Sequence, residues 1–445
     1  PIKSSAASDV YKRQVLELVY RYIYFQEVKY MLLSHKTIIK LSDNYSNIIG
    51  HMCYAAYKLW NICNYEKLHN KELNLPVSFP DWYYQKAAHK NNLWYKQLPS
   101  QTAQEICKQL NSSWNSYFKL LKTGGIKNPK PPRFKHDNIA VTYMQNGIMH
   151  NSDVVRLSIS KGLKDFMSKE YGINDDYLYL KNPIFKNIDT IKQIKIYPPE
   201  GNCCNVIVIY EVPDIIKLAD NGKYLSIDLG LKNLMTCLNS ETGETFIIGK
   251  KYLSLCRYYY KEIARIQSQW YHQQIKMDIK YPKSSKHIKK MYIKKNNVIK
   301  DYLYKITRHI VNYCKANGIN TVVVGDITGI RKDNVKDDKY NQKMHFLSYD
   351  KIYQMLEYKL ALEGINFIKQ NEAYSSQTSP LADKVCKKNA EKSNRVYRGL
   401  YVDGENVWNA DCVGAYNILR LYLKNDAIKL SPYDIKVPKI IKVAA

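Results

Sequence analysis

Two short apolar runs joined by one helical stretch constrain the fold of this chain most strongly. Thr321–Val324 is a continuous β-branched run, and Ile365–Ile368 is a second run of strand length. Between them, Ser348–Leu362 carries apolar residues at helical spacing. Two buried strands linked by a helix imply a parallel β–α–β crossover. The apolar run before Asp228 can join the same sheet, so the sequence predicts an α/β domain.

Acidic residues lie at the points where these strands are expected to end. Asp228 comes directly after Leu225–Ile227, Glu372 comes shortly after Ile365–Ile368, and Asp411 begins the last helical stretch. The carboxyl ends of parallel strands meet at one edge of a sheet, which is where ligands collect in open α/β folds. We therefore expect the three carboxylates to converge.

Three carboxylates at one edge would repel one another unless cations lie between them. Two Mg²⁺ ions about 4 Å apart can activate a water and stabilise the leaving oxygen of a phosphodiester. Each acid alone also has a structural interpretation: a turn residue for Asp228, a surface acid for Glu372 and a helix N-cap for Asp411. Their joint placement favours Asp228, Glu372 and Asp411 as catalytic residues and ligands of a two-Mg²⁺ site.

The charge balance predicts a polyanionic partner. The chain has 445 residues, with 68 Lys and Arg against 40 Asp and Glu, which leaves a formal charge of +28. No run of about 18 apolar residues is present to span a bilayer, so a membrane partner is not expected. The 40 tyrosines are interleaved with lysines and can stack on bases beside neutralised phosphates, which favours nucleic acid. An AT-rich genome would also enrich these residue types.

The cysteines indicate a reducing compartment. Ten cysteines are scattered without a pairing rhythm, which is not typical of a secreted disulfide framework. A cytoplasmic location is expected. At the start of the chain, Pro1–Gln14 lacks an initiator Met and resembles a translated sequencing-adapter end, so it is left out of the fold prediction.

The first half of the chain indicates a helical module and a small β-barrel. Ser42–Asn44 can cap one helix, and a second helix begins near Pro99–Ser100. Short alternating runs between Ile139 and Val212 predict a small barrel, which is expected to pair with an early strand at Lys36–Leu41.

Two long helical patterns, Leu253–Met277 and Lys289–Asn317, predict a hairpin rich in lysine. The lysines are either a solvated helix face or a set of phosphate contacts, and the neighbouring acidic site favours the second interpretation. They are Lys276, Lys280, Lys283, Lys286, Lys289, Lys290, Lys294 and Lys295.

Two motifs around the acids resemble a known family. Ser226–Leu231 resembles the first RuvC motif of TnpB proteins, and Asn409–Ile418 resembles the third. The resemblance covers most of the chain after Lys36. It extends to Leu98–Gln101, Pro132–Lys135 and Tyr358–Lys359.

The resemblance implies a fold and an activity. The fold would be α/β plus β-barrel: an RNase H-like RuvC domain with a split wedge β-barrel and a helical recognition module. The activity would be that of a prokaryotic, nucleoid-associated RNA-guided endonuclease, with a guide RNA from the transposon end and a double-stranded DNA target cut beside a short flanking motif. The oligomeric state stays open.

Domain boundaries follow from the resemblance and the patterns together. The expected parts are an N-terminal extension at 1–34, the wedge barrel at 35–43 and 135–215, the recognition module at 44–134, the nuclease domain at 216–374 and 408–425, a zinc-finger-like insertion at 375–407, and a C-terminal tail at 426–445.

The second RuvC carboxylate departs from the family pattern. The usual glutamate would align with Gly325. Some relatives carry a relocated glutamate before a Ser-Ser segment, and Glu372 before Ser375–Ser376 fits that arrangement. Its longer side chain can reach inward from the neighbouring strand. Asp326 is the alternative.

The insertion also departs from the pattern. It offers only Cys386 and Cys412 and no histidine, so four zinc ligands cannot be assembled and zinc is not expected. Its basic residues form either a flap that contacts DNA or a solvated loop. They are Lys384, Lys387, Lys388, Lys392, Arg395 and Arg398.

Three alternatives to a transposon-encoded nuclease remain open. A nuclease-inactive, RNA-guided DNA-binding repressor would share the fold. A miniature type V CRISPR effector would share nearly every feature. A transposase that joins DNA ends is disfavoured, although the RNase H fold also serves integrases.

Overall fold

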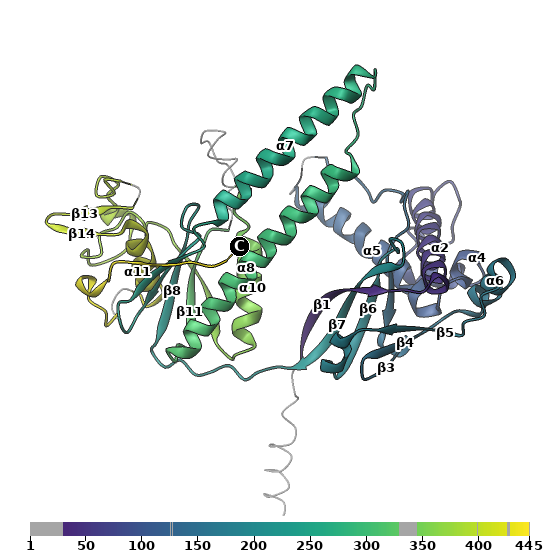
Figure 1. Ribbon diagram of the computed structural model, residues 1–445, viewed down its shortest axis with the longest axis horizontal. Coiled ribbons are helices and arrows are strands. Elements are labelled where there is room, and N and C mark those ends of the chain that lie inside the picture. The colour runs from purple at the N-terminus through teal and green to yellow at the C-terminus, as the bar shows by residue number, and fades with distance from the viewer. Residues whose placement is uncertain are drawn as a thin grey trace, which may run out of the picture. The chain divides into compact units, whose positions relative to one another are not determined.

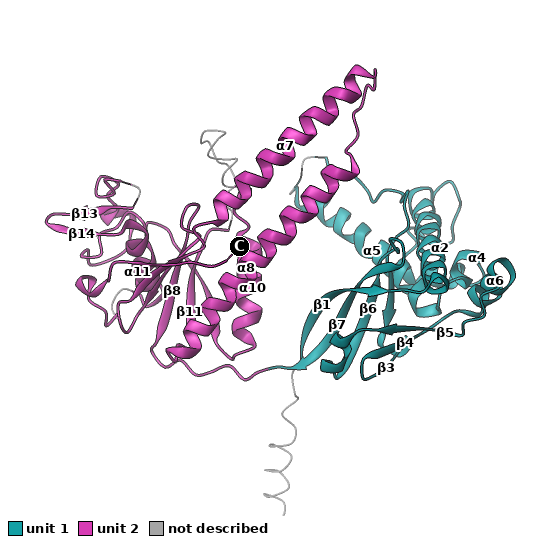
Figure 2. Cartoon of the chain, viewed as in Figure 1, with its two compact units in different colours: residues 1–214 teal, residues 215–445 magenta. Residues whose placement is uncertain are grey.

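The structure is a computed structural model that describes residues 30–124, 126, 128–328, 345–397, 399–424 and 428–444. The chain divides into two compact units, residues 1–214 and 215–445, which are coloured separately in Figure 2. The prediction for Pro1–Gln14 lies outside the described residues. None of the described helices is long and apolar enough to cross a membrane.

Two antiparallel sheets form the β part of the first unit (Figure 1). One has the order β1-β7-β6-β2 and the other the order β3-β4-β5. The early strand pairs with β7 in antiparallel register from Tyr30 opposite Pro213 to Lys40 opposite Cys203, which confirms the predicted pairing. The strands are β1 (Tyr30–Lys40), β2 (Val141–Met144), β3 (Ile148–Asn151), β4 (Val154–Ser158), β5 (Tyr177–Lys181), β6 (Thr190–Ile196) and β7 (Cys203–Pro213).

Five helices complete the first unit as described. Ser42 caps the first of them by accepting a hydrogen bond from the Tyr45 amide, as the sequence predicted. One helix lies in a region where only strands were expected: Ser160 caps it, and Leu163 and Met167 bury one face of it. The helices are α2 (Asp43–Leu68), α3 (Trp82–Ala88), α4 (Leu93–Lys96), α5 (Ser100–Thr123) and α6 (Lys161–Tyr171).

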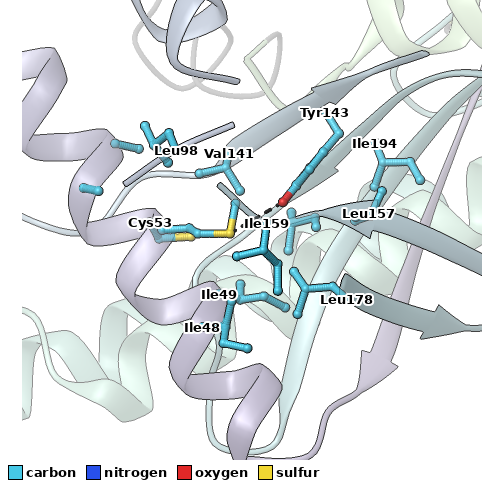
Figure 3. Close-up of a cluster of buried hydrophobic side chains, with 14 of the residues drawn as sticks. Ile48, Ile49, Cys53, Leu98, Val141, Tyr143, Leu157, Ile159, Leu178 and Ile194 are labelled. Atoms are coloured by element: carbon cyan, nitrogen blue, oxygen red, sulfur yellow. Dashed lines mark hydrogen bonds between the residues drawn. The ribbon is translucent and has the colours of Figure 1, made fainter. Parts of the chain in front are cut away.

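A single apolar core joins the helices and strands of the first unit (Figure 3). Ile49 and Cys53 of α2 face Tyr143 of β2, whose side chain is 1% exposed. Its hydroxyl donates to the Ser158 carbonyl oxygen at 2.9 Å, so the one polar atom of this buried ring has a partner.

The second unit is built on one six-stranded sheet with the order β12-β11-β8-β9-β10-β15. β11 lies between β8 and β12 and is parallel to both, which confirms the predicted crossover. β15 lies in the segment expected to be a C-terminal tail and adds an edge strand parallel to β10. The strands are β8 (Tyr224–Leu229), β9 (Met235–Asn239), β10 (Thr245–Ile248), β11 (Thr321–Asp326), β12 (Asn366–Asn371) and β15 (Lys439–Ile441).

Helices cover both faces of this sheet (Figure 1). Side chains alternate along a strand, so Leu225 and Ile227 of β8 pack with the core of α8 and α10. Tyr224 packs with α11 on the other face, where the Ser226 hydroxyl also donates to the Ala415 carbonyl oxygen. The helices are α7 (Tyr252–Lys276), α8 (Lys286–Ala316), α10 (Tyr349–Ala361) and α11 (Ala410–Tyr422).

The segment before α11 is irregular, as expected, and is fixed to α11 by one side chain. Arg420, 4% exposed, donates from its guanidinium to the carbonyl oxygens of Pro380 and Asp383. A two-stranded ribbon of β13 (Tyr401–Asp403) and β14 (Asn406–Trp408) leads into the helix. Short 3₁₀ helices occur at Gln145–Gly147, Pro183–Asn187, Lys387–Asn389 and Pro432–Asp434.

Candidate active site

The three predicted acids line one cavity at the carboxyl edge of the second sheet. Asp228 is the next-to-last residue of β8, Glu372 follows β12 directly, and Asp411 is the second residue of α11. All three line a cavity of about 680 Å³. Even-numbered residues of β8 face α11, so the Asp228 side chain lies on that face. The expected convergence of three elements distant in sequence is therefore found.

Glu372 reaches this cavity across β11, through the space that Gly325 leaves open. A β-carbon at position 325 would overlap Glu372 Oε2 and would lie 2.9 Å from Ile418 Cδ1 of α11. Gly325 is thus the residue that makes room for the Glu372 carboxylate. The carboxylate stands where a side chain at position 325 would begin.

Asp228 packs against a second glycine, which lies on α11. A β-carbon at Gly414 would lie 2.8 Å from Asp228 Oδ2. Removal from water, and then the charges of Glu372 and Asp411, raise the pKa of Asp228 well above its usual value, while the charge of Arg395 opposes that rise. Ionisation of the Asp228 carboxyl group is therefore unfavourable unless a further cation binds beside it.

Asp411 is held by two neighbours. Arg395 Nη2 donates to Asp411 Oδ1 at 2.8 Å, and Asn233 Nδ2 donates to Oδ2 at 2.8 Å. The helix N-cap is Asn409, whose side chain accepts from the amides of Asp411 and Cys412. The Asp411 carboxylate is therefore not needed as the cap and remains directed at the cavity.

Arg395 also lines the cavity, and the sequence did not predict that it would lie beside the acids. It was grouped with the basic residues of the insertion as a candidate DNA contact. In the structure it lines the acidic cavity and pairs with Asp411, with 31% of its side chain exposed. Arg398 lies outside the described residues.

Asp326, the alternative second acid, does not line the cavity. Its Oδ1 accepts a hydrogen bond from the Thr328 amide at 2.9 Å, which is a local turn contact. Its charge still acts on Glu372. Burial, and then the charge of Asp326, raise the pKa of Glu372 to about 7.

The donor set fits a hard divalent cation. Glu372 Oε2 is buried and has no hydrogen-bond partner among the described residues, and carboxylate oxygens are the ligands that Mg²⁺ prefers. Within the described ranges, however, no three His, Cys, Asp or Glu side chains are already close enough together to hold a metal ion. One of the three acids, Asp411, is paired with Arg395 instead.

The two cysteines near the insertion differ in exposure. Cys412 is fully buried in α11, and burial raises the pKa of its thiol to about 12. Cys386 is partly exposed.

The lysines of the α7–α8 hairpin are mostly exposed, with one exception. Lys295 is 7% exposed, and its ammonium group lies 4.1 Å from the ring centre of Tyr260. Its inclusion among the phosphate contacts was wrong, because a buried ammonium stacked on an aromatic ring cannot reach a phosphate at the surface.

Two parts of the chain match known protein families. Residues 207–331 match the OrfB_IS605 family, described as a probable transposase. Residues 349–418 match the Cas12f1-like TNB domain. The first match contains Asp228, and the second contains Glu372, Arg395 and Asp411. Together they confirm the resemblance predicted from the motifs.

In these two regions the chain is similar to TnpB proteins.

One solved structure shares the fold of this TnpB-like chain, and a second is similar over nearly its whole length. A Cas12f1–sgRNA–target DNA complex contains a chain with 14% identity and a TM-score of 0.55, and the match covers 84% of this chain and 81% of that one. The mini-RNA-guided endonuclease CRISPR-Cas_phi3 matches at 12% identity with a TM-score of 0.48, over 96% and 99% of the two chains. At 14% identity, the first likeness supports the mixed α/β fold alone. No curated protein matches the sequence.

Proposed function

We propose that this TnpB-like protein is an RNA-guided, metal-dependent DNA endonuclease that hydrolyses phosphodiester bonds beside a short flanking motif. The observation that carries the proposal is the meeting of Asp228, Glu372 and Asp411 in one cavity at the carboxyl edge of a parallel sheet. The raised pKa of Asp228 and the unpartnered Glu372 Oε2 support a cation as the missing member of the site.

Each acid has a distinct part in this proposal. Asp228, Glu372 and Asp411 would hold the metal, and Asp411 would have to leave the Arg395 guanidinium to do so. Two bound Mg²⁺ ions would supply an activated water and stabilise the leaving oxygen. Arg395, freed from Asp411, remains at the cavity and can donate to a phosphate oxygen of the DNA.

The nucleic-acid partners follow from charge and from the relatives. The formal charge of +28 favours a polyanionic partner. The Cas12f1 structure that shares this fold is a complex with an sgRNA and target DNA. By analogy with that complex, the proposed partners here are a guide RNA encoded beside the gene and a double-stranded DNA target. The proposed architecture places a split wedge barrel and a helical recognition module in the first unit.

The test is guided cleavage. The protein is co-expressed with RNA transcribed from the DNA that flanks its gene, purified, and mixed with plasmids that carry a guide-matched target beside randomised flanking sequence. Mg²⁺-dependent cutting by the native protein, and none by Asp228→Ala, is the expected result. Intact plasmid in Mg²⁺ across all flanking sequences would overturn the proposal.

A guided repressor without nuclease activity is the second candidate. It is favoured by the Arg395 contact to Asp411 at 2.8 Å and by the absence, among the described residues, of acids already spaced to hold a metal. Guide-dependent DNA binding that survives without any cutting would support it. A CRISPR array beside the gene would instead point to a miniature type V effector.

A further inference from the structure

One buried hydroxyl bridges two backbone groups at the carboxyl end of β11. Tyr353 lies on α10 with its side chain 2% exposed, and its hydroxyl donates to the Gly325 carbonyl oxygen at 2.6 Å. The same hydroxyl oxygen accepts from the Ile327 amide at 3.0 Å. Gly325 is the next-to-last residue of β11, and Ile327 follows the strand directly. A side chain from a helix therefore holds the end of this strand.

The bridge lies where the pairing of β11 becomes one-sided. β11 pairs with β8 only as far as Val324, but with β12 as far as Asp326. Beyond Val324 the ladder to β8 has ended, and buried backbone groups that leave a ladder need other partners. The Tyr353 hydroxyl is such a partner for both Gly325 and Ile327.

The ring that carries this hydroxyl is itself fixed in place. Tyr353 belongs to the apolar core that α8 and α10 share with the sheet, and its ring centre lies 6.3 Å from that of Phe367 on β12. The ammonium group of Lys369 lies 4.5 Å from the Tyr353 ring centre. Burial raises the pKa of the Tyr353 hydroxyl, so the hydroxyl keeps the proton that it donates to Gly325.

The backbone that Tyr353 holds is also the backbone that leaves room for Glu372. A β-carbon on Gly325 would overlap Glu372 Oε2, so the carboxylate lies against β11 at this residue. Ile327, the other partner of the hydroxyl, lines the acidic cavity. A shift of this strand end by about an ångström would displace the carboxylate enough to impair its chemistry. Tyr353 acts on the cavity from outside, because it does not line it.

We propose that Tyr353 is a positioning residue for the metal site: its hydroxyl fixes the end of β11 and thereby holds the Glu372 carboxylate where it can bind a divalent cation. The inference rests on the proposed function, which supplies the cation. Side chains that orient metal ligands without touching the metal typically contribute about 10- to 100-fold in metal affinity. Removal of the hydroxyl with the ring kept is therefore expected to weaken metal binding.

The test measures Mn²⁺ binding to the full chain by electron paramagnetic resonance, with no nucleic acid present. Tyr353→Phe keeps the ring and removes only the bridging hydroxyl. Tyr313→Phe is the matched control, because its hydroxyl also has two partners, Asn239 and Glu244, but at the opposite edge of the same sheet. Asp228→Ala identifies which of the ions bound by the native chain belong to the acids.

Tyr353→Phe is expected to bind Mn²⁺ about tenfold more weakly than the native chain, and Tyr313→Phe is expected to keep the native affinity. Guided cleavage by Tyr353→Phe is expected to need about tenfold more Mg²⁺ for its half-maximal rate, with a smaller loss of the rate at saturating Mg²⁺. Each variant loses a hydroxyl with two partners, so thermal unfolding occurs at a lower temperature in both. A loss of metal affinity in Tyr353→Phe alone is therefore separate from the loss of stability.

Hydrogen exchange in the native chain decides the question if Tyr353→Phe does not fold. Coupling between two sites is reciprocal, so an ion whose binding depends on the bridge also strengthens the bridge. Mn²⁺ is then expected to slow exchange of the Ile327 amide severalfold. The Asn366 amide, which donates to the Asn320 carbonyl oxygen at the opposite edge of the sheet, is expected to exchange at an unchanged rate. Exchange of the Ile327 amide that Mn²⁺ does not change overturns the inference.

The remaining outcomes separate this inference from the proposed function. Native Mn²⁺ affinity in folded Tyr353→Phe, or equal losses of affinity in Tyr353→Phe and Tyr313→Phe, overturns the inference and leaves the proposed function standing. Mn²⁺ binding that Asp228→Ala does not reduce means that the acids hold no ion. That result overturns the proposed function and the inference together.

Discussion

The carboxylate of Glu372 occupies the space in which a β-carbon on Gly325 would have to stand. The two residues lie on neighbouring parallel strands, where Gly325 is paired with Gln370, two residues before Glu372. The Glu372 carboxylate, at the end of β12, therefore fits only because residue 325 on β11 has no side chain. This relationship supports Glu372 as the second acid of the site and makes it testable by substitution.

Gly325→Ala is expected to reduce cleavage by about 100-fold or more, because it displaces the Glu372 carboxylate by about an ångström. The added methyl also meets Ile418, and overpacking of this kind costs about 1–3 kcal/mol of stability. Cleavage rates and thermal unfolding measure the two effects. Gly222→Ala is the control for an alanine in the same unit, since a β-carbon at that loop position meets nothing within 4 Å, although its positive φ adds modest strain. A native cleavage rate in Gly325→Ala would contradict the role of Gly325 in making room for the Glu372 carboxylate.

Moving the acid provides a gain-of-function test. Glu372→Ala alone is expected to abolish cutting, and Glu372→Ala with Gly325→Glu is expected to restore a measurable part of it. In the double variant the new side chain starts in the space that the old carboxylate filled. Guided plasmid cleavage is the measurement. Activity in Glu372→Ala itself, at the native rate, would show that this acid is dispensable.

Asp326→Ala separates the two candidate acids. The Asp326 carboxylate accepts from the Thr328 amide and does not line the cavity, so its loss is expected to lower stability by about 1 kcal/mol and to leave cleavage within severalfold of native. A variant that folds but cannot cut would transfer the role of second acid to Asp326.

Arg395→Ala is expected to lower the cleavage rate by about 100-fold while guided DNA binding is retained, a magnitude typical of losing one charge-stabilising donor. Arg395 holds Asp411 and so competes with metal for that carboxylate, and its loss therefore also lowers the Mg²⁺ concentration needed for half-maximal rate. Arg395→Lys keeps the charge and should recover part of the activity. A normal Mg²⁺ dependence in Arg395→Ala would contradict the link to Asp411.

The raised pKa of Glu372 predicts how the metal-free protein responds to pH. The folded pKa of about 7 lies above the reference of 4.5, so the folded state binds the proton more tightly than the unfolded state. Stability in EDTA should therefore fall as pH rises from about 4.5 to 7, and Glu372→Gln should be more stable than native above pH 7. Thermal unfolding across that range measures it. A native protein that gains stability over the same interval, relative to Glu372→Gln, would refute the assignment.

Much of the second unit could be predicted because its signals are local. The β-branched run Thr321–Val324 and the apolar run near Phe367 are short, and α10 lies between them in the described residues. Two such strands with a helical connection can be arranged in one sheet in only a few ways. Asp228 and Glu372 come at the ends of such strands, so their meeting follows from the parallel order.

Other features depend on contacts that no local pattern records. The pairing of Arg395 with Asp411 joins an irregular segment to a helix, and Arg395 looks like any other cation in a basic run. Lys295 likewise looks exposed in sequence, yet it is covered by Tyr260. Helix α6 was missed because only Leu163 and Met167 bury its face, which is too weak a periodicity among the alternating strands around it.

The most direct test of the central claim is the anomalous scattering of Mn²⁺ in crystals of the full chain. We expect Mn²⁺, standing in for Mg²⁺, to be bound about 2.1 Å from oxygens of Asp228, Glu372 and Asp411, with the Arg395 guanidinium moved off Asp411. Mn²⁺ that is bound elsewhere, or a site in which the Arg395–Asp411 pair persists and no ion joins the three acids at saturating Mn²⁺, would contradict the account.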